Sequence, residues 1–493
     1  MLLSRLISKI KYTGTPSEKE INLVTCNSSQ AGEGALFVCI KGFVSDGHDF
    51  VLGVYSQGCR DFIAEHAIEG LPDDANLIIV KNSRAALAYA SAEFYGNPSQ
   101  EMTIIGITGT KGKTTTALMM KQILDGVGIP TGYIGSNGIM YGPCKFESTN
   151  TTPESIIIQK YLRSMSDFGI KCVVIEVSSQ ALSLNRVLGV DFDICIFTNF
   201  SPDHIGENEH PNLEAYFKAK KKLFDDFSPK LVCVNADDAM SERILENCKS
   251  EIVRYSVFNQ SDCKAENIAL CKTNSILGVS FSVFEDGESR TYTIPMPGEF
   301  NVYNALAAIS VSEWMGVESD DIVKSLAGVK IDGRFEVYPT AKGASFVIDY
   351  AHNGISLTSV LLSLRQYCPK KLICLFGSVG GRTQIRRFEM GLAAAKYADF
   401  SILTADNPDF ESVDLIIDDI AKQFEDSDKY IRIPDRREAI QYAYSIAGKG
   451  DIVLLAGKGH EKYQLVGGKK EYFCESEILD DCIMQETFFA GKK

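Results

Sequence analysis

Short apolar runs that end in a polar motif recur along the chain and alternate with segments of helical periodicity. The runs are rich in β-branched residues, and a glycine, hydroxyl, acid or histidine stands close after each one. They cover residues 103–107, 173–177, 194–198, 231–234, 346–348, 372–376, 401–403 and 452–455. Segments between them, such as 115–127 and 154–168, carry apolar residues at helical spacing. This alternation predicts parallel sheets covered on both faces, with ligands bound beyond the carboxyl ends of the strands.

Two breaks divide this pattern into three α/β units. Residues 96–102 have the composition of a linker, and a helix is predicted to end near 328–333 before the next unit begins. We therefore predict a smaller N-terminal α/β domain over residues 1–100. The glycine-rich, lysine-containing segment GITGTKGKTT at 106–115 follows the first strand of the next unit, so we predict a central P-loop ATPase-like domain with a parallel or mixed sheet over 101–331. A Rossmann-like domain is predicted over 332–493. The length of 493 residues agrees with three domains of ordinary size.

Composition excludes several classes of protein. The chain is 45% hydrophobic and 23% charged, which is typical of a globular protein and not of a disordered or fibrous one. Its net charge of −14 argues against a general nucleic-acid binder. No apolar stretch approaches the roughly 18 residues of a spanning helix, so we expect a cytoplasmic protein without a membrane span. The 14 cysteines form no C-x-x-C pair and are expected to be buried, reduced thiols.

The segment GITGTKGKTT at residues 106–115 is the strongest chemical motif. It lies between a predicted strand and a predicted helix, so its backbone N–H groups and the helix N-terminus can bind phosphates. Lys113 can reach the β and γ oxygens, and Thr114 can hold Mg²⁺. The spacing departs from the general phosphate-loop form, because glycine stands at Gly106 and not at position 107. The residues predicted to bind ATP here are Gly109, Thr110, Lys111, Gly112, Lys113, Thr114 and Thr115.

Further motifs follow in order along the chain. They are NTTPE (150–154), EVSS (176–179), DH (203–204), GEFNVYN (298–304), GRFE (333–336), DYAH (349–352), DNP (406–408) and GKGHE (457–461). Together with the phosphate loop they resemble the Mur ligase family, and most resemble its members that add the third residue of the peptidoglycan stem peptide. The resemblance implies an ATP-dependent ligase. ATP would phosphorylate the γ-carboxylate of a D-glutamate, and an amino acid would displace the phosphate from the acyl phosphate.

The resemblance implies a magnesium site and a set of catalytic residues. Glu176 ends a predicted strand, where its carboxylate can coordinate a hard cation, and His204 corresponds to the family's metal-binding histidine. Lys220 aligns with the family's carbamylated lysine (N6-carboxylysine), although a solvated basic face is the alternative for this lysine-rich segment. The predicted metal ligands are Thr114, Glu176 and His204. The predicted catalytic residues are Lys113, Glu176, His204, Lys220 and Arg334.

Further contacts to ATP are implied outside the phosphate loop. Asn301 and Asn304 would face the adenine, and Arg334 would face the transferred phosphate. Asp349 and His352 would contact the nucleotide from the third domain. An arginine supplied by a separate domain would make catalysis depend on domain closure.

Two segments resemble the part of the family's site that binds the uridine-diphosphate substrate. Ser28 and His48 correspond to binding residues, but the usual acid and arginine of the first motif are here Asn27 and Ser29, so a plain turn is the alternative. Gln180 stands where relatives usually have histidine after EVSS, and either side chain can hydrogen-bond a substrate. The residues implied at the muramoyl-dipeptide end are Asn150, Thr151, Thr152, Ser178 and Arg186.

A third set of residues is implied in binding the incoming amino acid. It consists of Arg382, Asp406, Asn407, Pro408, Asp409, Gly457 and Glu461. Relatives that use meso-diaminopimelate carry arginine after DNP, where a guanidinium can bind the distal carboxylate bidentately. Asp409 at this position would repel that carboxylate and favour a terminal ammonium, so we expect L-lysine. meso-Diaminopimelate is the alternative, because Arg382 and GKGHE are retained.

Two other functions are compatible with parts of the sequence. Folate polyglutamate ligases share the phosphate loop and the three-domain plan, but they are not expected to combine NTTPE, DNP and GKGHE. A non-catalytic nucleotide-binding homologue would not need the metal and acyl-transfer residues. The expected partners are small molecules, namely ATP, a UDP-N-acetylmuramoyl dipeptide and a diamino acid. The sequence does not determine the oligomeric state, and a monomer agrees with it.

Overall fold

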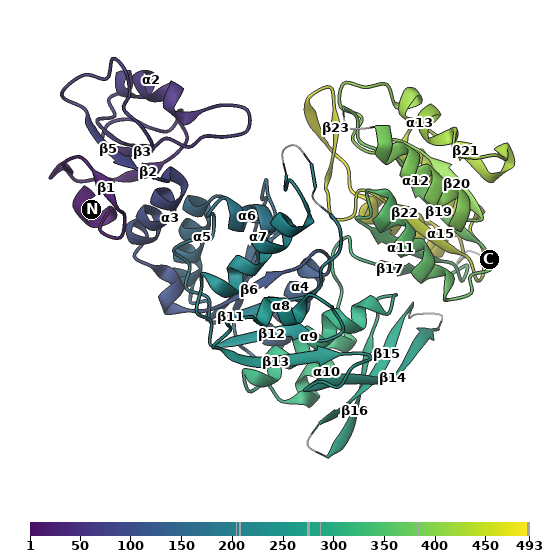
Figure 1. Cartoon of the computed structure of the whole chain (residues 1–493). Coiled ribbons are helices and arrows are strands. Elements are labelled where there is room, and N and C mark those ends of the chain that lie inside the picture. Colours follow the sequence, from purple (N-terminus) through teal and green to yellow (C-terminus); the bar gives the residue numbers. More distant parts are fainter. Residues whose placement is uncertain (204, 207–208, 274–276, 286, 382–383, 491–493) are drawn as a thin grey trace. The chain divides into compact units, whose positions relative to one another are not determined.

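The structure is a computed structural model that describes residues 1–203, 205–206, 209–273, 277–285, 287–381 and 384–490 (Figure 1). Its contacts divide the chain into two compact units. One consists of Met1–Lys264 with Leu306–Asp321, and the other of Ala265–Ala305 with Ile322–Lys493. Among the described residues, no helix is long and apolar enough to cross a membrane.

A five-stranded sheet forms the N-terminal part of the first unit. In spatial order its strands are β1 (Tyr12–Thr13), β5 (Asn76–Val80), β4 (Asp61–Ala64), β3 (Ala35–Val38) and β2 (Leu23–Thr25). Only β1 pairs antiparallel among these strands. The accompanying helices are α1 (Leu3–Leu6), η1 (Gly47–Phe50), α2 (Val51–Ser56) and α3 (Ser83–Phe94). Leu36 and Phe37 belong to different hydrophobic clusters, so the sheet is covered on both faces.

A larger sheet carries the phosphate-loop motif. In spatial order its strands in the first unit are β14 (Cys263–Lys272), β13 (Glu251–Ser256), β12 (Leu231–Asn235), β11 (Ile194–Phe197), β6 (Thr103–Thr108), β10 (Cys172–Glu176), β7 (Thr131–Gly135), β8 (Gly138–Tyr141) and β9 (Cys144–Phe146). The pairs from β13 to β7 are parallel, whereas β8 and β9 are antiparallel additions. The helices that follow these strands are η2 (Pro98–Glu101), α4 (Lys113–Gly126), α5 (Ser155–Phe168), α6 (Ser179–Ser183), α7 (Leu213–Asp225) and α8 (Ser241–Leu245).

The second unit contains an antiparallel extension and a separate parallel sheet. β14 continues there and pairs with β15 (Leu277–Glu285), which pairs with β16 (Glu288–Ile294). The helices α9 (Phe300–Trp314) and α10 (Ser319–Ala327) follow in the chain. The separate sheet has the spatial order β17 (Glu336–Pro339), β18 (Ser345–Asp349), β22 (Ile452–Ala456), β19 (Leu372–Phe376), β20 (Phe400–Leu403) and β21 (Tyr430–Arg432), parallel except for β17.

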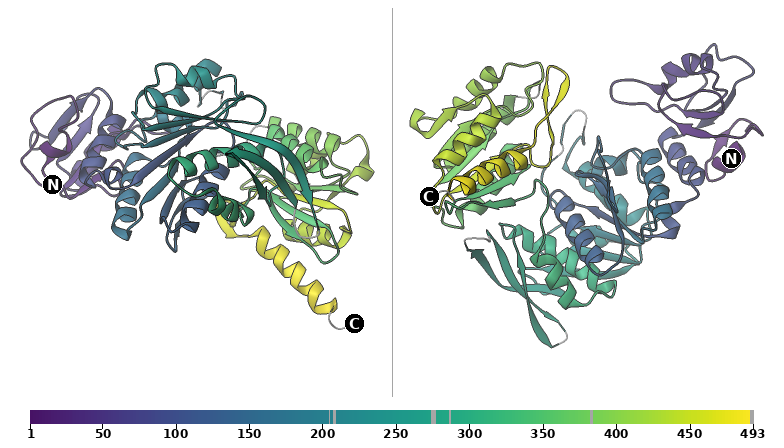
Figure 2. Two further views of the ribbon diagram at one scale, coloured as in Figure 1. Left: turned by 90° about the horizontal axis from the view of Figure 1, so that it is seen from below. Right: turned by 180° about the vertical axis from the view of Figure 1, so that it is seen from behind.

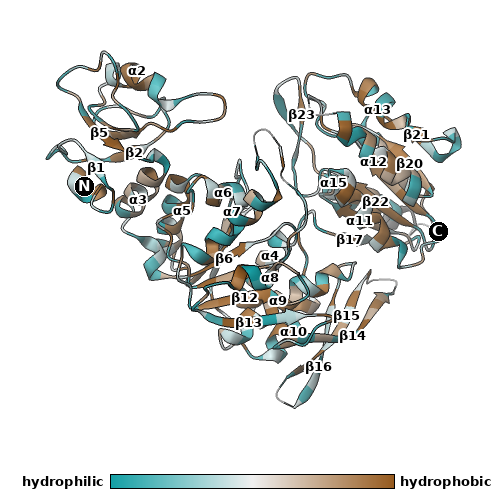
Figure 3. Cartoon of the chain, in the orientation of Figure 1, coloured by the Kyte–Doolittle hydropathy of each residue, from teal (hydrophilic) through white to brown (hydrophobic). Residues whose placement is uncertain are grey.

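Helices and one hairpin complete the second unit (Figure 2). The helices are α11 (Gly354–Arg365), α12 (Gln384–Tyr397), α13 (Val413–Ala421), η3 (Ser427–Lys429), α14 (Arg436–Ile446) and α15 (Glu475–Ala490). The hairpin consists of β23 (Tyr463–Val466) and β24 (Lys469–Tyr472), which pair with each other in a two-stranded sheet. Residues of α14 and α15 form one hydrophobic cluster with the C-terminal strands, which are largely hydrophobic in Figure 3. Each fully buried aliphatic side chain in such a cluster contributes about 1.5–3 kcal/mol.

A buried ion pair joins the ends of several of these elements. Arg436, at the start of α14, pairs with Glu475 of α15 at 2.9 Å, and both side chains are fully buried. The same guanidinium donates to the carbonyl oxygens of Ala405 (2.9 Å) and Ala456 (2.7 Å). The guanidinium therefore fixes the carboxyl end of β22, the segment just after β20, and the start of α15.

The predicted fold class is confirmed. Each of the eight apolar runs coincides with an observed strand to within one residue, and the helices α4 and α5 lie where periodicity predicted them. The central sheet is mixed, which was one of the predicted forms, but the positions of its antiparallel strands were not predicted; antiparallel pairing brings in β8, β9, β15, β16, β17 and the β23–β24 hairpin. The polar motifs do follow the carboxyl ends of the parallel strands, which gathers several of them at common edges.

Candidate active site

The phosphate loop occupies residues 109–112, between the end of β6 and the start of α4. Gly109 has φ +151° and Gly112 has φ +86°, and L side chains rarely adopt either conformation. A Cβ on Gly109 would lie 1.9 Å from the hydroxyl oxygen of Thr198. Only glycine is therefore compatible with the loop at this position, and α4 presents its first N–H groups at the end of the loop.

Two lysines bind the backbone of this loop. Lys113 Nζ donates to the carbonyl oxygens of Gly109 (2.8 Å) and Thr110 (3.1 Å). Lys220 Nζ, from α7, donates to the same Gly109 oxygen at 2.7 Å. Lys111 instead pairs with Asp203 at 3.1 Å. Lys113 and Lys220 thus share a carbonyl of the predicted phosphate-binding loop.

Lys220 differs from its neighbours on α7. It is 1% exposed, whereas the Lys218 side chain is 72% exposed, so a solvated basic face does not describe Lys220. Its Nζ lies 4.5 Å from the centre of the Tyr216 ring. Burial, followed by the nearby Lys113 charge, holds the pKa of Lys220 well below its ordinary value, with Asp203 opposing this. This shift favours the neutral form of the Lys220 amine.

Glu176 ends β10 and is fully buried. Its carboxylate accepts hydrogen bonds from the hydroxyls of Thr114 (2.9 Å) and Tyr133 and from the backbone N–H of Ser136 (3.0 Å). Two of the three predicted metal ligands, Thr114 and Glu176, are thus in direct contact. The third, His204, lies outside the described residues.

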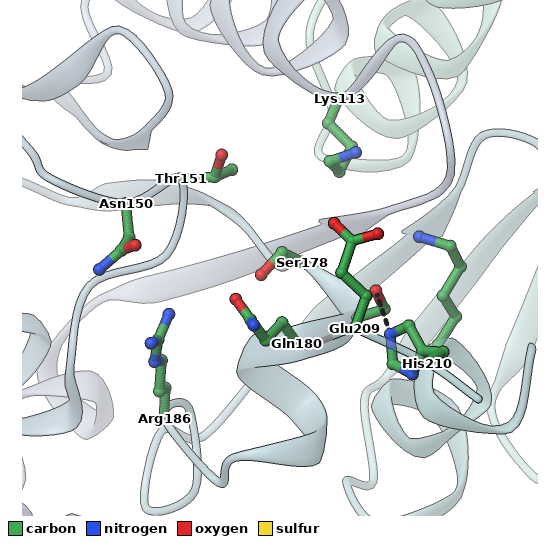
Figure 4. A pocket seen from close by; sticks show the side chains of 10 residues that line it. Lys113, Asn150, Thr151, Ser178, Gln180, Arg186, Glu209 and His210 are labelled. Carbon is green, nitrogen blue, oxygen red and sulfur yellow. Dashed lines mark hydrogen bonds between the residues drawn. The ribbon is translucent and has the colours of Figure 1, made fainter. Parts of the chain in front are cut away.

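A cavity of about 180 Å³ lies beside the phosphate loop (Figure 4). Its lining residues are Lys113, Asn150, Thr151, Ser178, Ser179, Gln180, Arg186, Glu209, His210 and Lys220. The structure therefore brings together most residues predicted for the muramoyl-dipeptide end and two predicted catalytic lysines.

Thr152 does not line this cavity, but it links two segments that do. It is fully buried, its hydroxyl donates to the Glu176 carbonyl at 2.7 Å, and it accepts the Ser178 N–H at 3.0 Å. Arg186 donates to the Thr152 carbonyl (3.2 Å) and to the Glu154 carboxylate (2.9 Å). These bonds join the NTTPE and EVSS segments and orient the Arg186 guanidinium.

The sequence reasoning missed several cavity residues, among them His210, Glu209 and Ser179. His210 is buried, and its Nε2 lies 2.9 Å from the Ser179 hydroxyl. A signal was present, because one of only six histidines stands beside an acid just before α7. His204 stands in a motif that follows a predicted strand, whereas His210 belongs to none of the recognised motifs.

His48 and the segment around Ser28, predicted to bind the uridine end of the substrate, are hydrogen-bonded within the chain. The Nδ1 of His48 is hydrogen-bonded to Asp46, its Nε2 accepts the Glu65 N–H at 3.0 Å, and its ring stacks on His66. The Asn27 side-chain oxygen accepts the N–H (3.0 Å) and the hydroxyl (2.9 Å) of Ser29, which is a plain Asx turn. Ser28, within this turn, is half-buried. Ser28 and His48 do not line the cavity described above.

The asparagines predicted to face adenine lie at the start of α9. Both are buried, and Asn301 donates to the Pro297 carbonyl at 2.7 Å. Asn304 donates to the side-chain oxygen of Asn301 at 3.0 Å. The two amides thus hold one another in a fixed orientation.

The GRFE and DYAH segments contact each other in the second unit. Asp349 is buried and accepts the Phe335 N–H at 3.0 Å, and burial raises the pKa of its carboxyl. The Arg334 guanidinium lies 4.9 Å from the centre of the Tyr350 ring. Burial lowers the pKa of His352, whose Nδ1 lies 2.8 Å from the Tyr350 carbonyl. His352 is therefore favoured as a neutral imidazole.

A buried lysine organises the predicted amino-acid site. Lys458, fully buried within GKGHE, donates to the side-chain oxygens of Asn407 and Glu461, each at 2.8 Å. Asn407 also donates to Glu461 at 3.0 Å. Asp406 is buried, which raises its pKa, and a Cβ on Gly457 would lie 2.7 Å from its carboxylate. Sequence reasoning singled out the partners of Lys458 but not Lys458 itself.

Two more predicted residues flank this group. Pro408 is buried, and Asp409 contacts the β23–β24 hairpin. Arg382 lies outside the described residues.

The chain matches known proteins along nearly its whole length. Residues 20–95 match the Mur ligase family, catalytic domain; residues 107–312 match the Mur ligase middle domain; and residues 333–459 match the Mur ligase, glutamate ligase domain. The chain is 38% identical over 488 residues to the UDP-N-acetylmuramoyl-L-alanyl-D-glutamate–2,6-diaminopimelate ligase of Caldanaerobacter subterraneus subsp. tengcongensis, covering 98% of this chain and 99% of the relative. Its identity to the ligase of that name from Aquifex aeolicus is 37% over 465 residues, covering 94% of each chain.

Solved structures extend the comparison. One of a ligase with the same name superposes with a TM-score of 0.72 at 26% identity, covering 99% of this chain and 100% of the other. The folylpolyglutamate synthase of Mycobacterium tuberculosis, complexed with ADP, has a TM-score of 0.61 at 16% identity, covering 76% and 91%, which shows a common fold alone. The relatives match almost the whole chain and the phosphate loop is intact, so the chain belongs to the Mur ligase family and is an ATP-dependent ligase that joins an amino acid to an acid.

Proposed function

We propose that this chain uses ATP to join a diamino acid to the D-glutamate γ-carboxylate of UDP-N-acetylmuramoyl-L-alanyl-D-glutamate, a step of peptidoglycan synthesis. The cavity beside the phosphate loop carries this proposal. Lys113 lines it together with Thr151, Ser178 and Arg186. A carboxylate held by these hydroxyls and this guanidinium would lie beside the loop that binds phosphate, within reach of the γ-phosphate.

The proposed reaction has two steps. A γ-carboxylate oxygen attacks the γ-phosphorus of ATP, and the bond between this phosphorus and the bridging oxygen breaks. ADP departs, and the product is an acyl phosphate. The neutral amine of the diamino acid then attacks the acyl carbon, and inorganic phosphate leaves as the nitrogen loses a proton. Both steps develop negative charge on phosphoryl oxygens, which Lys113, the loop N–H groups and Arg334 stabilise. We assign Asn301, Asn304, Asp349 and His352 to nucleotide binding.

Thr114 and Glu176 fit a magnesium site, with His204 as the further ligand that the sequence indicates. A buried carboxylate and a hydroxyl in contact at 2.9 Å offer the oxygen ligands that Mg²⁺ prefers. When bound, Mg²⁺ would neutralise charge on the phosphates.

We also propose that Lys220 is carbamylated. A neutral amine adds to CO₂ and loses a proton, which gives an anionic carbamate. The burial that lowers the pKa of Lys220 supplies the neutral form of the amine. The carbamate would then place a negative charge close to Lys113 beside the phosphate loop.

We propose 2,6-diaminopimelate as the diamino acid. The charge of Asp409 favoured L-lysine on sequence grounds, with meso-diaminopimelate as the alternative. The relatives from Caldanaerobacter and Aquifex, at 38% and 37% identity, are both named for 2,6-diaminopimelate, which supports the alternative over lysine.

The test is phosphate release by the purified chain with ATP and Mg²⁺. Release should require both the UDP-muramoyl dipeptide and a diamino acid, and 2,6-diaminopimelate should give the highest kcat/KM in a panel with lysine and ornithine. Release without the dipeptide, or no release with any diamino acid, would refute the ligase assignment. Faster turnover of lysine would refute only the choice of diamino acid.

The setting of the reaction is part of the proposal. We place it in the cytoplasm. We assign residues 1–100 to the uridine end of the substrate, 101–331 to ATP and 332–493 to the amino acid. Size-exclusion chromatography with light scattering tests the oligomeric state.

A further inference from the structure

The β23–β24 hairpin is attached to the segment that follows β20. Within the hairpin, β24 is exposed and β23 is at most half-buried, and the strands pair with each other in a two-stranded sheet. A two-stranded hairpin has little stability of its own in water. Its position therefore depends on the bonds that join it to neighbouring chain.

Asp409 makes three of these bonds. Its N–H donates to the Leu465 carbonyl, and its carbonyl accepts the Gly467 N–H, both at 2.9 Å. Its carboxylate Oδ1 accepts the Gly468 N–H at 2.7 Å. The side chain thus caps the turn of the hairpin, and the backbone of Asp409 bridges to Val466 in parallel register.

The neighbouring residues of the DNP motif extend the contact. The Asn407 side-chain oxygen accepts the Leu465 N–H at 2.9 Å, and Gln464 donates to the Asp406 carbonyl at 2.7 Å. The oxygen of Asn407 that binds the hairpin is also the one that binds Lys458. Movement of the hairpin would therefore disturb the Asn407 amide in the proposed amino-acid site.

The conformation of Asp409 suits this role. Its φ is +53°, in the left-handed region that aspartate and asparagine tolerate better than other non-glycine residues. A carboxylate or a side-chain amide oxygen can accept the Gly468 N–H, whereas an arginine or alanine side chain cannot.

We propose that Asp409 is a positioning residue that fastens the β23–β24 hairpin to the DNP segment and so holds Asn407 in place, and that it does not select the incoming amino acid by charge. This inference rests on the proposed function for its link to the amino acid. It weakens the electrostatic objection to a substrate with two carboxylates, because one oxygen of the Asp409 carboxylate accepts the Gly468 N–H of the hairpin turn.

Two substitutions separate the roles of hydrogen bonding and charge. Asp409→Asn keeps an oxygen for the Gly468 N–H and removes the charge, whereas Asp409→Ala removes both. Asp409→Ala should raise KM for lysine and for 2,6-diaminopimelate by the same several-fold factor, with KM for ATP unchanged. Asp409→Asn should restore much of the loss and keep the wild-type ratio of the two kcat/KM values. Glu425→Ala, at an exposed acid between α13 and η3, is the matched control.

Hydrogen exchange of the segment 463–472 gives a readout that is independent of activity. Exchange should be faster in Asp409→Ala than in the wild type and near the wild-type rate in Asp409→Asn. A tenfold change in the substrate ratio with Asp409→Asn would show selection by charge and overturn the proposal, as would unchanged exchange in Asp409→Ala. If the wild type turned over neither diamino acid, the proposed function would fail, and the exchange measurement would still decide whether Asp409 fastens the hairpin.

Discussion

Replacing Lys458 with methionine should weaken the second unit and its amino-acid site together. The Lys458 ammonium is fully buried and lies 2.8 Å from oxygens of both Asn407 and Glu461. Burial by itself would raise the pKa of Glu461, but the charge and hydrogen bond of Lys458 outweigh it and hold this pKa below its ordinary value. Methionine keeps the apolar stem and removes the ammonium, which leaves the Glu461 carboxylate without its cation.

The expected loss follows from this burial. Removing one partner of a buried ion pair costs about 3–5 kcal/mol. The Glu461 side chain retains 15% of its exposure and its bond from Asn407, so we expect a value near the lower end, about 3 kcal/mol. The exposed pair of Lys462 and Glu477, at 4.0 Å, supplies a matched control, and Lys462→Met should cost less than about 1 kcal/mol.

Native-state hydrogen exchange at β22 suits this comparison, because a multidomain chain need not unfold in one transition. The opening free energy of these amides should fall by about 3 kcal/mol in Lys458→Met, with KM for the diamino acid raised and KM for ATP unchanged. Adding Glu461→Gln should recover part of the loss, since it removes the orphaned charge. A loss below about 1 kcal/mol, no larger than in Lys462→Met, would refute the reasoning.

Three further predictions concern the phosphate loop, Lys220 and pH. Gly109→Ala should abolish measurable ATP binding in calorimetry, because a Cβ would meet the Thr198 hydroxyl at 1.9 Å, whereas Gly128→Ala, with φ +79° and open space around it, should cost only about 1 kcal/mol of stability and leave ATP binding intact. Lys220→Met should lower kcat by about 10²-fold or more, and native mass spectrometry should find added CO₂ in the wild type and not in this variant; an unmodified but fully active wild type would contradict the carbamate. The pKa of Glu461 is lowered in the folded state, so its stabilisation is present above its unfolded pKa, about 4.3, and is lost as the pH falls through the folded value. The stability difference between wild type and Lys458→Met should therefore shrink on acidification, and a difference that grew instead would contradict this assignment.

The parallel part of the fold could be predicted from sequence because its strands are buried on both faces. Continuous apolar runs such as 372–376 mark these strands almost to the residue. The positions of the antiparallel strands could not be predicted because the two sides of these strands are unequally exposed. In β14, for example, burial alternates irregularly around a bulge between Glu266 and Ala269. Pairing of such strands depends on neighbours distant in sequence.

The candidate site was predictable where chemistry follows from spacing. The phosphate loop and Glu176 are of this kind, since strand ends place them at one edge of the sheet. Lys458 and His210 escaped because their importance arises from burial and partners, which a linear motif does not reveal. The inference from Asp409 to lysine treated its charge as facing the substrate, whereas a left-handed backbone turns that carboxylate toward Gly468.

The buried Arg436–Glu475 pair has a consequence for anyone who shortens or fuses this chain. A truncation before Glu475 would strand a guanidinium in the interior, and that guanidinium also binds the carbonyls of Ala405 and Ala456. Each of these carbonyls lies one residue before a predicted amino-acid-binding residue, Asp406 or Gly457. The first turn of α15 therefore supports the two segments that carry the predicted amino-acid-binding residues, and cuts or fusion points are safest beyond it.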